Sequence, residues 1–146
     1  MRPALLPFAA MLSLAGCQSG SDEAAVPGDR KDDRPFAEIS AKESVRFIGT
    51  EPFWGGSVTG DEMTYETPEK PAGDRITVAR FAGRGGLSYS GKLAGADLTM
   101  TITPGACSDG MSERRYPYTV MLQIGDAMRS GCGYSDGHPF EGPKAP

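Results

Sequence analysis

The chain has 146 residues, of which 20 are glycine and 12 are proline, and its formal net charge is −4. This length suits one domain, and the many turn-forming residues favour β structure over helices. Because the chain is acidic and has no basic stripe, we expect no nucleic-acid partner.

The first sixteen residues have the pattern of a secretion signal. Arg2 provides a short basic start, and an apolar run follows from Ala4 to Leu14. A membrane-spanning helix needs roughly 20 apolar residues, whereas a signal peptide needs roughly 7–15 of them. The pattern therefore predicts a signal peptide at residues 1–16 and an exported protein.

The signal ends in Leu14-Ala15-Gly16-Cys17, which resembles the lipobox of bacterial lipoproteins. In that family the cysteine thiol receives a diacylglycerol and the signal is cut off before it. The resemblance implies a lipidated, palmitate-bearing Cys17 on the periplasmic face of a membrane; the alternative is an ordinary signal with a chance cysteine. Two or more acyl chains anchor a protein stably. Gln18, rather than Asp, follows the cysteine, which favours the outer membrane over the inner membrane, the second candidate.

Three further regions follow from composition. Residues 17–35 are polar and charged, and they hold too few large apolar side chains to offset the entropy cost of ordering. We interpret them as a flexible tether to a folded domain at residues 36–136. Residues 137–146 are similar in character and are expected to form a flexible tail, in which Phe140 is suited to dock.

Within the domain, apolar residues alternate with polar ones at a period of two. Leu98, Met100 and Ile102, for example, alternate with threonines, which is typical of a half-buried strand. Strands are predicted at 45–48, 53–58, 63–66, 76–79, 87–90, 98–103, 118–124 and 128–133. Turns are predicted at 59–61, 71–74, 83–86, 94–97 and 124–126, with one helical turn at 38–43. This pattern predicts an all-β fold, an antiparallel meander of about eight short strands that forms a small barrel or sandwich.

Two cysteines remain once Cys17 is assigned to lipid. Cys107 and Cys132 are an even pair in an exported domain, which predicts a disulfide bond. The alternative is a metal site or a reactive thiol. Zinc would need further ligands, and the sole histidine is His138 in the predicted tail. We therefore expect neither a metal nor a cofactor.

Two motifs carry a family resemblance. The first runs from Phe47 to Trp54 (FIGTEPFW), and the second runs from Cys107 to Ser112 (CSDGMS) and is followed by Gly131-Cys132-Gly133. Together they resemble a family of uncharacterised proteobacterial envelope lipoproteins over residues 44–142. This resemblance implies a periplasmic β domain without an assigned activity. The chain is more loosely similar to META/HslJ-like domains and to membrane-bound lysozyme inhibitors, but it lacks the additional cysteines of the inhibitors.

The first motif contains three candidate site residues, Glu51, Phe53 and Trp54. Neighbouring residues in a strand point to opposite faces, so one aromatic ring is expected in the core and the other at a surface or barrel end. In a structural interpretation the motif is a corner, with Glu51 accepting backbone N–H groups. In a functional interpretation the three residues belong to a ligand or partner surface.

The second motif contains the candidates Asp109 and Ser112. Their side chains sit in a glycine-containing loop and readily bond the local backbone, which favours a structural role over a binding role. Met111 is expected to fill a gap in the core rather than bind a metal.

Three functions remain open from the sequence. A Ser–His–Asp site would depend on His138, and no spacing selects a pair among the carboxylates, so we expect no catalytic residues and no enzyme. The leading hypothesis is a binding or inhibitor-like module that acts on a periplasmic protein or an envelope glycan. The alternatives are a structural or stress-related envelope lipoprotein without a ligand, and a small hydrolase.

Overall fold

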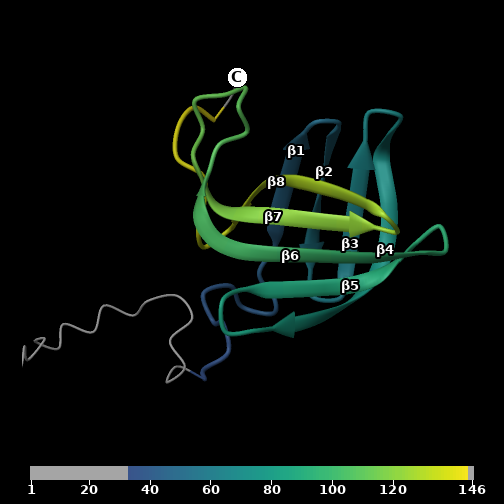
Figure 1. Cartoon of the computed structure of the whole chain (residues 1–146). Coiled ribbons are helices and arrows are strands. Elements are labelled where there is room, and N and C mark those ends of the chain that lie inside the picture. The colour runs from purple at the N-terminus through teal and green to yellow at the C-terminus, as the bar shows by residue number, and fades with distance from the viewer. Residues whose placement is uncertain (1–32, 145–146) are drawn as a thin grey trace, which may run out of the picture.

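The computed structural model describes residues 33–144, which form a closed antiparallel barrel (Figure 1). Each strand pairs with the next in the chain, and the last pairs with the first. The strands are β1 (Val45–Thr50), β2 (Phe53–Thr59), β3 (Glu62–Thr67), β4 (Lys70–Ala82), β5 (Leu87–Leu93), β6 (Ala96–Cys107), β7 (Tyr116–Ile124) and β8 (Ala127–Ser135). The predicted all-β meander is confirmed, as a barrel rather than a sandwich. The predicted signal peptide, Cys17 and the tether up to residue 32 lie outside the described residues.

The alternating pattern produces a filled interior. Leu98, Met100 and Ile102 of β6 are at most 1% exposed, whereas the threonines between them lie on the outer face. An eight-stranded barrel is just wide enough for its inward side chains to fill it. The core is therefore a packed interior rather than a channel.

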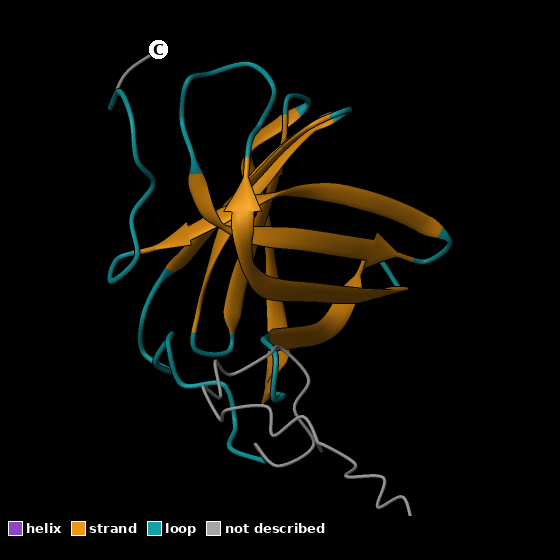
Figure 2. Ribbon diagram, turned by 60° about the vertical axis from the view of Figure 1, so that its left-hand side comes forward, coloured by secondary structure: helices purple, strands orange, loops and turns teal. Residues whose placement is uncertain are grey.

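Two local predictions were wrong. Residues 71–74 were expected to form a turn, but they lie inside β4, because β3 and β4 are joined at residues 68–69 and Thr67 pairs with Lys70. Gly73, with φ of 73°, lies opposite the register shift between Tyr65 and Thr67, so its left-handed conformation belongs to a β-bulge rather than to a turn. The helical turn expected at 38–43 is also missing: residues 33–144 contain strands and loops only (Figure 2). The described residues accordingly include no helix able to cross a membrane.

The segment before β1 covers one end of the barrel, which we call the Ile39 end. The Ile39 side chain is 1% exposed and belongs to the core. Its backbone carbonyl accepts a 2.7 Å hydrogen bond from Arg80 Nη2, and the N–H of Phe36 donates to the carbonyl of Gly83 at 2.7 Å. These contacts attach residues 36–39 to the barrel.

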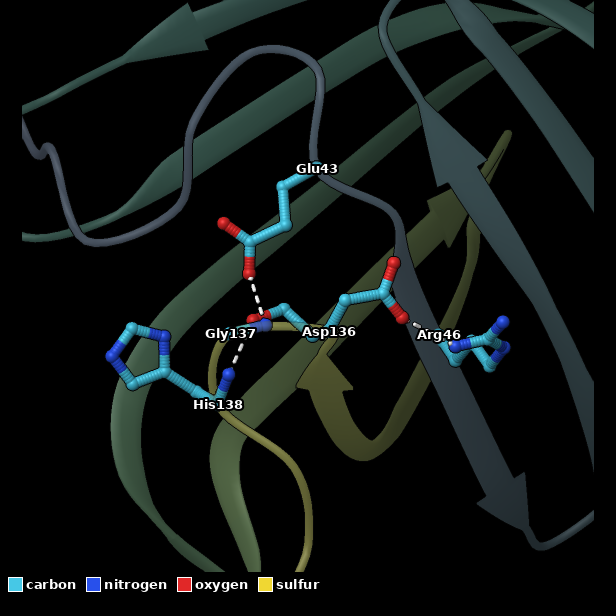
Figure 3. Close-up of polar contacts among 6 residues, drawn as sticks. Glu43, Arg46, Asp136, Gly137 and His138 are labelled. Carbon is cyan, nitrogen blue, oxygen red and sulfur yellow. Dashed lines mark hydrogen bonds and ion pairs between the residues drawn. The ribbon is translucent and has the colours of Figure 1, made fainter.

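Polar contacts fasten the end of β8 to this same segment (Figure 3). Glu43 Oε1 accepts a hydrogen bond from the N–H of Gly137 at 2.7 Å. Hydrogen bonds from the Ser135 hydroxyl and from Gly137 lower the pKa of Glu43. Beside them, Arg46 and Asp136 form an ion pair at 2.9 Å. The beginning and the end of the barrel are thus held together.

Residues 137–144 differ from the flexible tail that composition suggested. The Phe140 ring lies 5.0 Å from the Tyr134 ring, centroid to centroid, and the Arg114 guanidinium lies 4.6 Å from the Phe140 centroid. The backbones of Arg115 and Glu141 exchange two hydrogen bonds, so the 108–115 connection (green) and the C-terminal segment (yellow) run side by side in Figure 1. Aromatic and cation–π contacts supply the order that the polar composition did not reveal.

Candidate binding site

The predicted cysteine pair is brought together. Cys107 at the end of β6 and Cys132 on β8 lie at disulfide-bonding distance, with their Cα atoms 5.6 Å apart. The pair fastens the 108–115 connection to the barrel. In the described part of the chain, no group of three His, Cys, Asp or Glu residues could hold a metal ion.

Asp109 organises the 108–115 connection. Its Oδ1 accepts hydrogen bonds from the N–H groups of Met111 and Ser112, at 3.0 and 2.8 Å. Its Oδ2 accepts from the Ser112 hydroxyl at 2.7 Å and from the Tyr116 hydroxyl at 3.1 Å. Desolvation raises the pKa of Asp109, but these hydrogen bonds outweigh it and lower the pKa to about 2. The Asp109 carboxylate and Ser112 are therefore engaged within the loop, as the structural interpretation expected. Met111 is 69% exposed, so the expectation that it fills a core gap was wrong.

Trp54 lies inside the barrel and is 3% exposed. Its indole packs between the rings of Phe47 and Tyr65, at centroid distances of 5.8 and 6.4 Å. Gly49 makes room for it, because a Cβ there would overlap the indole. A Cβ on Gly131 would lie 3.0 Å from Trp54 Cζ2, but it would first meet the backbone carbonyl oxygen of Ile48 at 2.2 Å. Gly49 thus serves the packing of Trp54, and Gly131 serves the close approach of the β1 and β8 backbones, and sequence reasoning missed both roles.

Phe53, the other aromatic residue of the motif, faces outward and is 51% exposed. It follows the exposed residues Glu51 and Pro52, which form the turn between β1 and β2 and are joined by a cis peptide bond. The Thr50 hydroxyl donates to the carbonyl of Asp109 at 3.3 Å, which ties this turn to the 108–115 connection. Of the three candidates in the first motif, the structure exposes Glu51 and Phe53 and buries Trp54.

Three hollows meet around this turn. The first, about 440 Å³, lies on the outer face of β1 and β2, with Phe53 on its floor. The second, about 590 Å³, lies between the β1–β2 and β3–β4 turns, and Phe53, Thr67 and Pro68 line both of these hollows. The third, about 300 Å³, extends from Thr50 to the cysteine pair. The first two hollows adjoin at these shared residues, and we call the two together the Phe53 groove.

Arg129 lines the second hollow and was not identified from the sequence. It is paired with the buried Leu122 across β7 and β8, so it occupies an inward position of the barrel. Its Nη1 donates a hydrogen bond to the Tyr65 hydroxyl. The sequence did contain a signal for this residue. Arg129, Gly131 and Gly133 alternate with a period of two and so share the inward face of β8, where a charged side chain is unusual. We call this end of the barrel the Arg129 end; it lies opposite the Ile39 end.

The structure offers no support for a hydrolytic site at His138. The hydroxyl of Ser135 accepts a hydrogen bond from the backbone N–H of His138, not from its imidazole, and Ser135 is fully buried. The imidazole instead lies edge-on to Tyr118, with ring centroids 6.0 Å apart. Glu51 and Asp109 line different hollows, and the pKa of Asp109 is lowered rather than raised. A carboxyl acid needs a raised pKa to donate a proton near neutral pH.

Comparison of the chain with protein-family models, with curated proteins and with solved structures finds no match. The resemblance to envelope lipoproteins therefore stays a prediction. The Phe53 groove has to be interpreted from its own geometry.

Proposed function

We propose that this protein is a non-enzymatic binding module, anchored by a lipid on Cys17 to the periplasmic face of the outer membrane. The lipobox-like sequence supports the anchor, and the cysteine pair agrees with an oxidising compartment. The tether would hold the barrel away from the membrane surface. A partner in the periplasm then binds at the Phe53 groove.

One observation carries the binding role: a half-exposed phenylalanine is held between two hollows by a rigid framework. Apolar rings in concave surroundings are the usual centres of binding energy. Phe53 is fixed because the next residue, Trp54, is locked in the core and because Thr50 is bonded to the 108–115 connection. A preorganised side chain loses little entropy on binding, so more of its contact energy appears as affinity.

The chemistry of the groove favours a protein segment as the partner. Phe53, Pro68 and Pro71 supply apolar walls, and charges of both signs come from two arginines and one glutamate, Arg46, Arg114 and Glu66. Mixed apolar and charged linings are typical of sites for peptide segments. An envelope glycan, which would stack on Phe53, is the alternative.

A structural role without a ligand is the second candidate. It is favoured because the polar and aromatic groups of the two motifs are used within the fold itself. The Asp109 carboxylate is fully engaged in its loop, and Trp54 fills the core. In that case Phe53 has no partner, and its exposure has no consequence.

Site-specific photo-crosslinking in intact cells distinguishes the two candidates. A benzoylphenylalanine replaces Phe53 in the full chain or, as a matched control, Phe81, which is 68% exposed and lies beside the 83–86 connection at the Ile39 end. The proposal predicts a discrete protein adduct from position 53, its loss on adding Glu66→Arg, and no such adduct from position 81. Equal adducts from both positions, or none from either, would favour the structural role.

A further inference from the structure

We propose that the second hollow, at the Arg129 end, binds the free C-terminal carboxylate of a short peptide, and that Arg129 receives this carboxylate. The inference rests on the proposed binding function and names the chemistry of its ligand. It concerns the part of the Phe53 groove that runs past the β1–β2 turn into the mouth of the barrel.

Within the described part of the chain, Arg129 is a half-buried cation that forms no ion pair with an acidic side chain. A guanidinium has five N–H donors, and the described contacts use one of them, toward the Tyr65 hydroxyl. Partly buried charges are normally paired, because desolvation without compensation is costly. The remaining donors therefore suit a ligand carboxylate, which a guanidinium can bind with two parallel hydrogen bonds.

Tyr65 is the positioning residue for this cation. Its ring is 4% exposed, and its centroid lies 5.9 Å from the Arg129 guanidinium carbon. The ring also packs against the buried Trp54, so it has no freedom to move away. Burial raises the pKa of the Tyr65 hydroxyl, although Arg129 acts in the opposite direction, so the hydroxyl stays neutral and accepts from the cation at neutral pH.

The walls of the hollow distinguish a peptide from a simple anion. Phe53, Pro52 and Pro68 line the same space as Arg129, so an apolar side chain next to the carboxylate finds apolar contacts. Glu51 and Glu69 line it too, and both are exposed. Two carboxylates that line the hollow away from the guanidinium repel a polyanion such as phosphate, whereas they attract the ammonium group of a zwitterion. A volume of about 590 Å³ accommodates two or three residues.

Isothermal titration calorimetry on the full chain, purified from cells in detergent, tests this chemistry with the dipeptide Ala-Phe. The matched ligands are Ala-Phe amide, which lacks the carboxylate, N-acetyl-Ala-Phe, which lacks the ammonium group, and inorganic phosphate. We expect Ala-Phe to bind and the amide to bind about tenfold more weakly or worse, as for loss of a charge-assisted hydrogen bond. The acetylated dipeptide and phosphate should both bind more weakly than Ala-Phe.

Three variants connect the affinity to the residues. Arg129→Gln should weaken Ala-Phe binding about as much as amidation of the ligand does, and it should be insensitive to amidation. Tyr65→Phe keeps the ring, and we expect a smaller loss that still depends on the ligand carboxylate. Arg84→Gln, an exposed arginine in the 83–86 connection, should bind like the unmodified chain.

The ligand comparison needs no variant, so it decides the matter even if Arg129→Gln fails to fold. Equal binding of Ala-Phe and its amide, tighter binding of phosphate, or no binding of Ala-Phe at about 10 mM would overturn the inference. If such a result came together with a specific adduct from position 53, the proposed binding function would stand and only its carboxylate chemistry would fail. If the adduct were also missing, both would fail.

Discussion

Replacing Gly49 with alanine tests how the first motif works. A Cβ built on Gly49 would lie 2.6 Å from Trp54 Cδ1 and closer still to Nε1 and Cε2. The indole cannot retreat, because Phe47 and Tyr65 pack against it and Gly131 lies beside its Cζ2 atom. The dihedral φ of Gly49 is not in the left-handed region, so the whole penalty comes from the collision of side chains.

Overpacking of a core costs roughly 1–3 kcal/mol, and a rigid, enclosed ring places Gly49→Ala near the upper limit, at about 3 kcal/mol. For a domain of this size, 1 kcal/mol corresponds to roughly 4–8 °C, so we expect Tm to fall by about 12–24 °C. Thermal and urea unfolding followed by circular dichroism measure this change. Gly85→Ala is the control, because a Cβ there would meet nothing within 4 Å.

A double-mutant cycle makes the test specific to the indole. In a Trp54→Phe background the smaller ring leaves space, so Gly49→Ala should cost clearly less than it does beside Trp54. The packing account is refuted if Gly49→Ala and Gly85→Ala lower Tm equally. It is also refuted if the cost of Gly49→Ala is the same in both backgrounds.

Three further predictions concern the loop and the titrating core. Replacing Cys107 and Cys132 with serine opens a loop with a sequence separation of 25, so the free energy of unfolding should fall by about 3.5 kcal/mol in urea titrations, and unchanged stability would contradict the bond. Hydrogen bonds lower the pKa of Asp109 to about 2 from an ordinary 3.8, so the stability it contributes is present above pH ~4 and is lost as the pH falls toward 2. The free energy of unfolding should therefore change less between pH ~4 and pH ~2 in Asp109→Asn. An unchanged dependence of this free energy on pH would count against the hydrogen-bonded loop. Burial and the nearby Glu38 raise the pKa of Tyr118 to about 12, so the stability that the neutral phenol contributes to the fold is present below pH ~10 and is lost as the pH rises through 12. In an ultraviolet titration, the Tyr118→Phe variant should lack the last tyrosine to ionise.

The fold was largely predictable because strand periodicity is a local property. The alternation along β6 and β7 indicated both the strands and their buried faces. The turn expected at 71–74 failed because Gly73 and its neighbours fit a bulge as well as they fit a turn, and only the pairing of Thr67 with Lys70 distinguishes the two. In residues 137–144 the Phe140 ring docks on Tyr134, as the sequence suggested for this ring, whereas the polar composition around it gave no sign of such order.

The motif that forms the candidate site could be predicted from the sequence, but the role of each of its residues could not. Sequence alone indicated that Phe53 and Trp54 face opposite ways, but it could not say which ring is buried. The space for the indole depends on Gly49, which pairs with Trp54 on the neighbouring strand and has no Cβ to overlap the ring. Arg129 escaped notice because its partner Tyr65 is 64 residues away in sequence, and only closure of the barrel brings the two together.

A lipid tether at Cys17 underlies the proposed binding module, and intact mass spectrometry of the membrane-extracted protein tests this tether. We predict a mature chain that begins at Cys17, with the added mass of a diacylglycerol and an acyl chain on that residue, and a Cys17→Ser variant that leaves the detergent phase. A chain that begins elsewhere, or that carries an unmodified Cys17, would contradict the claim.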